Sequence, residues 1–360
     1  MAILYYYLRF RLACLRRHKS FKATSCYKGG VMYKEYQGSD KKSRCQVLKE
    51  LNKLARHWSC YPDAYFLYAM FKKDFGDMEK MKSFVPQIAY GHLFARNRDP
   101  YYEILINDKI LFHDIMRNYG LPVPKRFFVY NYGSFKCDGR IIDPTEVDRI
   151  LSSITDDRIF IKRNKCGEGS GVSVAVRKDN GYFTDNGELL SAALILMKHR
   201  YDEFIFEKAI VQDPAIARFN PDSVNTCRVL TYKNKVISGA LRIGRKGSIV
   251  DNAAKGGLVV NIDTNTGCFS NYGLREYDAA RYYEHPDTHV AFKGAVLENW
   301  NDIKALVEKT SQLLPYYKSV GYDIACTTDG PVIVEINTGS AISVSQMGRD
   351  RGIADAFRNG

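Results

Sequence analysis

The last two predicted strands constrain this chain more than any other feature. Residues 322–327 and 331–337 are apolar-rich runs separated by Thr328-Asp329-Gly330. A three-residue loop with glycine at its last position is typical of a type I turn followed by a bulge. The two runs are therefore predicted to pair as a hairpin.

That hairpin brings oxygen ligands together. In the predicted register Asp323 lies opposite Glu335, and Asn337 shares the face of Glu335 because side chains alternate along a strand. Two neighbouring carboxylates repel each other unless a cation or a proton lies between them. Mg²⁺ is commonly held by such carboxylates together with substrate phosphates. The alternative is a pair of solvated residues on an exposed hairpin.

A glycine-rich loop follows another predicted strand. Residues 158–162 are strand-like, 172–176 form a returning strand, and the loop lies between them. Successive N–H groups in such a loop can cradle phosphate oxygens, and a lysine can add a point charge. An ordinary flexible hairpin loop would have the same composition. The candidate phosphate-binding residues are Lys162, Gly167, Gly169, Ser170 and Gly171.

Two further groups of residues are candidates. A strand at 203–207 ends in Glu207, Lys208, Ala209 and Ile210, where backbone groups could meet the edge of an adenine ring. Arg228 and Arg242 lie in strands that otherwise read as buried, and buried arginine is uncommon unless it is paired or binds an anion. A structural ion pair with Asp251 is the alternative. Polar neighbours that could contact a substrate are Asn225, Thr226, Asp251 and Asn252.

The positive charge is concentrated at one end of the chain. The net charge is +13, and residues 1–60 hold fourteen Lys/Arg and three Asp/Glu, so they account for +11. Aromatic and basic residues interleave over residues 5–17, which suits either a peripheral helix on an anionic membrane or a helix packed on the core. A nucleic-acid partner is not expected, because no recognised binding motif accompanies the charge.

Composition indicates a reduced, soluble protein. The nine cysteines are dispersed, with no CxxC pair, which suggests free thiols in a cytoplasmic compartment. No apolar run approaches the roughly 20 residues that a membrane-spanning helix needs. If the protein reaches a membrane, we expect it to do so peripherally, at the inner face.

The order of elements predicts an α+β fold in three regions. Residues 1–100 are basic and mainly helical, with a stripe that includes Leu48, Leu51 and Leu54. Residues 101–210 form a compact α+β lobe, whose first helix Asn107 could cap. Residues 211–360 form a second lobe, in which strands 226–232 and 236–242 flank a three-residue turn and a helix spans about 301–314.

The ordered set of motifs resembles the ATP-grasp superfamily, most of all its sugar-transfer-associated branch. The motifs are residues 223–228, then 250–252 with Gly256-Gly257, then His285-Pro286, then 321–323 and 330–337. The resemblance covers about residues 101–345. It implies an ATP-grasp fold, in which two α+β subdomains clamp ATP.

The resemblance also implies roles for residues. Lys162, with Lys109 as a second candidate, would contact the phosphates of ATP, and residues 207–210 would line the adenine and ribose. Asp323, Glu335 and Asn337 would hold Mg²⁺. Arg228 or Arg242 would stabilise the transferred phosphoryl group. His285 joins the candidate substrate contacts.

One departure from the family pattern bears on the reaction. Many ligases of the superfamily place an arginine two residues before the metal-binding aspartate, where this chain has Gly321. The expected reaction is ADP-forming ligation of a small-molecule or glycan carboxylate to an amine or hydroxyl, with a cell-surface glycan implied by the branch name. The alternative is a kinase, for which Asp251 or His285 could serve as the base.

Overall fold

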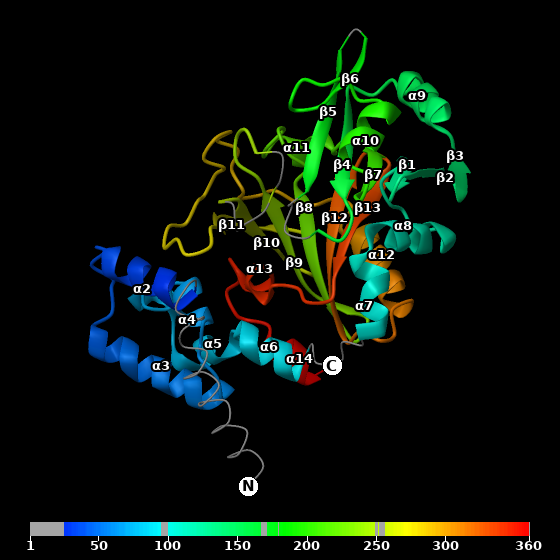
Figure 1. Cartoon of the computed structure of the whole chain (residues 1–360). Coiled ribbons are helices and arrows are strands. Elements are labelled where there is room, and N and C mark those ends of the chain that lie inside the picture. Colours follow the sequence, from blue (N-terminus) through cyan, green and yellow to red (C-terminus); the bar gives the residue numbers. More distant parts are fainter. Residues whose placement is uncertain are drawn as a thin grey trace. The chain divides into compact units, whose positions relative to one another are not determined.

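The computed structural model describes residues 25–94, 100–166, 171–178, 180–248, 251 and 256–359. The contacts group the chain into two compact units. One unit comprises Met1–Asp99, Asp213–Cys326 and Glu335–Gly360, and the other comprises Pro100–Gln212 with Thr327–Val334. The chain forms two sheets, whose strands are labelled in Figure 1, and most of each sheet lies in one unit; the tip of the hairpin 319–337 of the six-stranded sheet, Thr327–Val334, groups with the 100–212 unit. The predicted α+β class is confirmed, whereas the division into three regions stays a prediction.

The sheet of the 100–212 unit has seven strands in the order β3-β2-β1-β7-β4-β5-β6. Neighbouring strands are antiparallel. The apolar sides of two helices pack into the core under this sheet through Val147, Leu151 and Ile195. The elements are β1 (Arg126–Asn131), β2 (Ser134–Cys137), β3 (Arg140–Ile142), β4 (Arg158–Arg163), β5 (Val172–Lys178), β6 (Gly181–Phe183), β7 (Glu203–Lys208), α7 (Pro100–Asn107), α8 (Lys109–Asn118), α9 (Pro144–Ser153) and α10 (Ala192–Lys198).

The predicted strands at 158–162, 172–176 and 203–207 are confirmed, but the helix cap is corrected. Asn107 is the last residue of α7 rather than a cap. Asp108 caps α8, and its carboxylate accepts hydrogen bonds from the N–H groups of Ile110 and Leu111 at 3.0 and 3.1 Å. Aspartate is among the best N-cap residues because it satisfies N–H groups that have no partner within the helix.

The other unit has a six-stranded sheet in the order β11-β10-β9-β8-β12-β13. Ser238 and Gly239 are consecutive on β9. Ser238 donates to the carbonyl of Ser345 in α13, whereas a Cβ at Gly239 would meet Trp300 of α12 at 2.4 Å. Because consecutive strand residues point to opposite faces, α12 and α13 cover opposite faces of this sheet. The elements are β8 (Thr226–Tyr232), β9 (Lys235–Ile243), β10 (Leu258–Ile262), β11 (Phe269–Leu274), β12 (Ser319–Thr327), β13 (Gly330–Asn337), α11 (Pro214–Ala217), α12 (Trp300–Gln312), α13 (Ile342–Gln346) and α14 (Ala354–Asn359).

Both predicted hairpins of this sheet form with shorter turns than expected. Tyr232 pairs with Lys235, and Lys233 and Asn234 have φ of 47° and 64°, which is the two-residue type I′ turn. The last hairpin also turns through two residues, since β12 ends at Thr327 and β13 begins at Gly330. The predicted pairing of Asp323 with Glu335 assumed a three-residue loop. Because loop length fixes hairpin register, the two-residue turn removes that argument, and the pairing stays a prediction.

The N-terminal region is helical, as predicted, over the residues that the structure describes. Its buried face on α3 is formed by Val47, Leu54 and Trp58. Leu54 is buried and Leu51 packs against the core, as predicted, whereas Leu48 is 55% exposed and Val47 takes its place on the buried face. The elements are α2 (Ser25–Glu35), α3 (Arg44–Trp58), α4 (Ala64–Leu67), η1 (Lys73–Phe75), α5 (Met78–Ser83) and α6 (Gln87–Leu93).

These helices share one core with the sheet and support α13. Met32, Phe71 and Phe84 lie in the same buried cluster as Ala240 and Val259 of the sheet. The side chain of Gln346 accepts a hydrogen bond from the N–H of Val85 at 2.8 Å and donates to its carbonyl at 2.9 Å. Such a buried amide with both ends bonded fixes the end of α13 against the chain entering α6.

Candidate functional site

Four polar side chains converge on one face of the six-stranded sheet. Asp323 pairs directly with Arg228, and Thr226 pairs directly with Arg242. Residues that pair directly across neighbouring strands share a face, and so do residues two apart along one strand. The register of β8, β9 and β12 therefore brings all four to the same side.

Asp323 is buried, and its carboxylate is bonded by both arginines. Arg228 donates from Nε to Oδ1 at 2.5 Å and from Nη2 to Oδ2 at 3.1 Å. Arg242 donates from Nη2 to the same Oδ2 at 3.0 Å. Burial alone would raise the pKa of Asp323, but the two guanidinium groups hold that pKa below its ordinary value. The carboxylate is therefore charged in the folded protein.

Asp251 completes the cluster. Its Oδ2 accepts hydrogen bonds from the N–H of Thr226 at 2.8 Å and from the Thr226 hydroxyl, and its Oδ1 lies 3.2 Å from Nη2 of Arg242. Burial raises the pKa of Asp251 despite these partners. Burial would also lower the pKa of Arg242, but Asp251, Asp323 and Glu335 raise it. The structural ion pair considered from the sequence is present, and Arg242 also reaches Asp323.

Glu335 and Asn337 lie two residues apart on β13, beside β12, and are half-buried. The Nδ2 atom of Asn337 is buried and has no hydrogen-bond partner among the described residues. A carboxylate has about four acceptor positions, and the described bonds to Asp323 use three of them. One acceptor position thus remains on Asp323, and the carboxylate and amide oxygens of Asp323, Glu335 and Asn337 are of the donor types that suit a hard cation such as Mg²⁺.

The other candidate substrate contacts have structural partners. Asn225 is fully buried and donates from Nδ2 to the carbonyls of Ile216 and Asn220. His285 is also fully buried, and its Nε2 lies 2.9 Å from the carbonyl oxygen of Gly244. Burial lowers the pKa of His285, so the neutral ring is favoured. Asn252 lies outside the described residues.

A second group of candidates lies on the seven-stranded sheet. Lys162 Nζ is 2.6 Å from Oε2 of the buried Glu207, which joins β4 to β7. Lys109, at the start of α8, donates from Nζ to the carbonyl of Cys166 at the beginning of the glycine-rich loop. Of the two lysines proposed to contact phosphate, Lys162 is thus held by a strand of the sheet and Lys109 by the loop that follows β4. Gly167, Gly169 and Ser170 lie outside the described residues.

The end of the glycine-rich loop is tightly packed. Gly171 has φ of 74°, and a Cβ there would come 2.9 Å from Cβ of Arg163. Its carbonyl accepts a hydrogen bond from the N–H of Arg163 at 2.7 Å. Only glycine meets both demands at low cost, because it alone adopts positive φ freely and has no Cβ.

Sequence reasoning missed Asn164, which organises the start of this loop. Its Oδ1 accepts hydrogen bonds from the N–H groups of Lys109 and Lys165 at 2.7 and 3.0 Å, and its Nδ2 donates to Glu203 at 2.8 Å. The Lys109 bond spans 55 positions. No local pattern indicates such a bond.

At the strand end predicted to meet adenine, both the backbone and the side chain of Lys208 have partners. The Lys208 N–H is bonded to the carbonyl of Lys125 at 2.8 Å, and its ammonium lies 3.1 Å from Asp156. Ala209 and Ile210 follow the strand and are half-buried. Their predicted role stays a prediction.

A family model described as sugar-transfer associated ATP-grasp matches residues 92–359, which is well over half of the chain. The chain belongs to the sugar-transfer-associated ATP-grasp family. The resemblance identified from the sequence is thereby confirmed.

Solved ATP-grasp structures are similar at low identity. They include the ligase PsnB complexed with a minimal precursor, Mg and ADP (13% identity, 72% of this chain, 60% of that chain, TM-score 0.40). A RimK domain protein from Sphaerobacter thermophilus DSM 20745 is 14% identical, over 72% of this chain and 69% of that chain, with a TM-score of 0.39. D-alanyl-alanine synthetase A from Vibrio cholerae O1 biovar eltor str. N16961 is 12% identical, over 70% of this chain and 61% of that chain, with a TM-score of 0.41. The matched chain thus spans about 60% of PsnB. No curated protein matches significantly.

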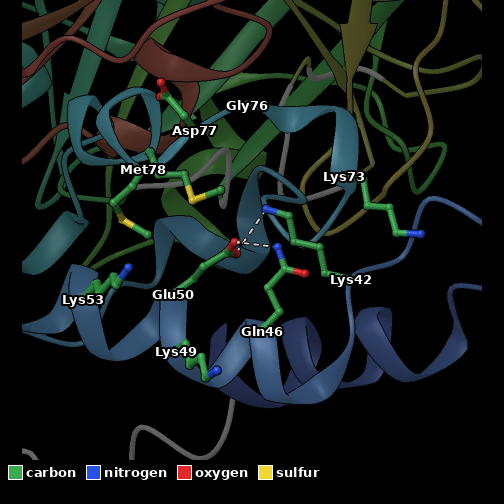
Figure 2. Close-up of a pocket in the computed structure, with 10 residues that line it drawn as sticks. Lys42, Gln46, Lys49, Glu50, Lys53, Lys73, Gly76, Asp77 and Met78 are labelled. Atoms are coloured by element: carbon green, nitrogen blue, oxygen red, sulfur yellow. Dashed lines mark hydrogen bonds and ion pairs between the residues drawn. The ribbon is translucent and has the colours of Figure 1, made fainter.

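This ATP-grasp chain also has a pocket of about 420 Å³ in its helical region, between α3 and the η1–α5 segment (Figure 2). The carboxylate that lies between its lysines already has partners: half-buried Glu50 accepts hydrogen bonds from buried Lys42 at 3.1 Å, from exposed Gln46 at 3.2 Å and from buried Tyr65 at 2.6 Å. Lys49 and Lys53 line it from exposed positions on α3. The arginine cluster, rather than this pocket, therefore carries the chemistry considered below.

Proposed function

We propose that this ATP-grasp protein is an ADP-forming ligase that joins a carboxylate to an amine, or to a hydroxyl, using ATP and Mg²⁺. In the first step a carboxylate oxygen of the substrate attacks the γ-phosphorus, and ADP leaves. In the second step the acceptor attacks the acyl carbon, loses its proton and displaces phosphate. Support comes from buried Arg228 and half-buried Arg242, which share one sheet face with Asp323, and from Glu335 and Asn337 on the strand next to that of Asp323.

The arginines would stabilise the phosphoryl group during transfer. Phosphoryl transfer depends mainly on positioning and charge neutralisation, and guanidinium groups suit phosphate oxygens. Arg228 and Arg242 are fixed by Asp323 before any substrate arrives, so their reorganisation during the reaction costs little. Asp323, Glu335 and Asn337 would hold Mg²⁺, which when bound supplies neutralisation of the phosphate charge.

The lysines of the seven-stranded sheet would bind the triphosphate. Lys162 and Lys109 are the proposed phosphate contacts, with Gly167, Gly169, Ser170 and Gly171 around them. Residues 207–210 are the proposed adenine and ribose contacts. Lys162 is 17% exposed at its side chain, so its charge is partly desolvated and acts strongly on a nearby phosphate.

The kinase alternative needs a general base near an acceptor hydroxyl. Both oxygens of Asp251 already have partners, and both ring nitrogens of His285 lie within hydrogen-bonding distance of backbone or side-chain atoms. These bonds favour structural roles for the two residues. The observations therefore favour ligation.

The substrate and the location are proposed more broadly. The family name supports a small-molecule or glycan carboxylate and an amine in polysaccharide biosynthesis, in the cytoplasm or at the inner face of a membrane. Among the described helices, none is long and apolar enough to cross a bilayer. The basic segment proposed to touch a membrane surface, residues 5–17, lies outside the described residues.

Substitution of Glu335 by Gln tests the ligase proposal. The variant keeps the shape of the side chain and removes its charge, so we expect it to abolish Mg²⁺-dependent ADP formation. Glu284→Gln, at an exposed ion pair with His289, is the matched control and should retain wild-type turnover. Near-normal turnover by Glu335→Gln would sink the assignment.

A further inference from the structure

Gly321 occupies the position where many ATP-grasp ligases place an arginine, and the structure shows why a side chain does not fit. Gly321 and Asp323 share one face of β12. A Cβ at Gly321 would lie 2.4 Å from Oγ and 2.6 Å from Cβ of Ser340. Such separations are too short for any real Cβ, so the space over Gly321 belongs to Ser340.

Ser340 uses that space to hold Arg228. It is 2% exposed and lies in the turn between β13 and α13. Its Oγ accepts a hydrogen bond from Nη1 of Arg228 at 3.0 Å. Since Asp323 bonds Nε and Nη2 of the same group, the guanidinium is anchored on two sides.

The anchoring leaves a defined set of donors on Arg228. A guanidinium has five N–H donors, and the three described bonds leave two. One is on Nη1 and one is on Nη2, which is the edge that binds two oxygens of a phosphate or carboxylate. The position of Ser340 thus sets the direction of the remaining donors.

We propose that Ser340 is a positioning residue that aims Arg228 at the reacting anion, and that Gly321 is glycine so that Ser340 can reach it. Arg228 then brings a guanidinium from β8 to this face, in place of an arginine at position 321. This inference rests on the proposed ligase function. It gives a role to Gly321 and Ser340, to which the family motifs had assigned none.

The turn that carries Ser340 is itself held by the helical region. Gln87, the first residue of α6, accepts a hydrogen bond from the N–H of Ile342 at 2.8 Å and donates to the Ser340 carbonyl at 3.5 Å. The backbone of this turn is therefore held in place by Gln87, independently of the Ser340 hydroxyl. Loss of the hydroxyl should leave the turn in place.

Ser340→Ala is the first test. Removing the acceptor frees Nη1 of Arg228, and hydrogen bonds to charged groups are among the stronger ones. We expect kcat to fall about ten- to a hundredfold, with the KM for ATP close to wild type and the thermal midpoint modestly lowered by the lost bond. A role limited to stability would lower the midpoint and leave kcat unchanged.

Two double variants separate the effect of the Ser340 hydroxyl from the effect of the volume that its side chain fills. Gly321→Ser with Ser340→Gly moves the hydroxyl to the other side of the same space, and Gly321→Ala with Ser340→Gly restores only the volume. We expect the serine exchange to recover kcat toward wild type and the alanine exchange to stay as slow as Ser340→Ala. Equal kcat for the two double variants would overturn the inference.

A readout without turnover separates this inference from the ligase proposal. If the wild type turns over no carboxylate–amine pair, the ligase proposal fails, and Arg228 is then followed by NMR through its side-chain Nε–H signal. A positioning role predicts slow exchange of that proton in the wild type and faster exchange in Ser340→Ala. Identical exchange in the two proteins would contradict it.

Discussion

Charge at Asp323 is balanced by Arg228 and Arg242 across three strands. Leaving one of these charges without its partner would cost about 3–5 kcal/mol, because a buried uncompensated charge is unfavourable. Asp323 in turn holds both guanidinium groups in place. Stability and the proposed catalysis therefore depend on the same side chains.

Sequence alone indicated the arginines but not their supports. Arg228 and Arg242 are conspicuous because each interrupts an apolar strand. Ser340 and Asn164 act through bonds that span 112 and 55 positions, so no local pattern reveals them. From the sequence, Gly321 was noticed only as a departure from the family pattern. The structure gives the reason for the glycine, since Ser340 occupies the space that a side chain at position 321 would need.

His285 gives a pH dependence of stability. Its pKa is lowered chiefly by burial, with Arg245 and His289 also lowering it and Asp287 and the Gly244 carbonyl opposing. The unfolded chain then binds more protons below the ordinary value of about 6.5, so stability falls as the pH drops through that range.

We therefore expect His285→Asn to flatten the loss of thermal stability between pH 7 and pH 5. Buried His113 and exposed His57, whose pKa values are also lowered, would account for the slope that remains. The exposed His289→Asn variant is the control and should keep the wild-type slope. An unchanged slope for His285→Asn would show that the buried ring does not resist protonation.

Strands were predictable as elements because alternation and β-branched residues identify them locally. The extents of β4, β7 and β8 agree with the predictions within one residue. Turn lengths were not predictable in the same way: Lys233 and Asn234 take positive φ although neither is glycine. On α3 the prediction was right for Leu51 and Leu54 and wrong for Leu48, because Leu48 and the neighbouring Val47 are both apolar and only packing distinguishes them.

The β4–β7 ion pair predicts the behaviour of one lysine variant. Lys162→Met should weaken ATP binding about tenfold or more, because a partly desolvated charge beside the phosphates is lost. Lys198→Met, which breaks the exposed pair with Glu188, is the matched control. Isothermal titration with a non-hydrolysable ATP analogue measures both, and equal affinities would remove Lys162 from the nucleotide site.

The whole molecule uses its helical N-terminal region to support the proposed active site. Gln87 and Val85 bond the segment from Ser340 to Gln346, which in turn holds Arg228 and covers the sheet. This connection was not apparent in the sequence, because the residues involved lie more than 250 positions apart.

The basic N-terminus leads to a prediction for the intact chain. Residues 1–20 should carry binding to anionic vesicles, since a polybasic segment gains about 1 kcal/mol per Lys or Arg near such a surface. Co-sedimentation with phosphatidylserine vesicles should retain the full chain and release a variant lacking residues 1–20. Equal sedimentation of both proteins would favour the alternative, in which the basic segment forms a helix packed on the core.

The products of nucleotide turnover distinguish a ligase from a kinase. ADP, AMP and free phosphate would be followed with Mg²⁺ while amino acids and uronic or amino sugars are screened. Ligation through an acyl phosphate predicts ADP and free phosphate in equal amounts, only when a carboxylate and an amine or hydroxyl acceptor are both present. ADP without free phosphate would indicate a kinase, and AMP would contradict the acyl-phosphate scheme.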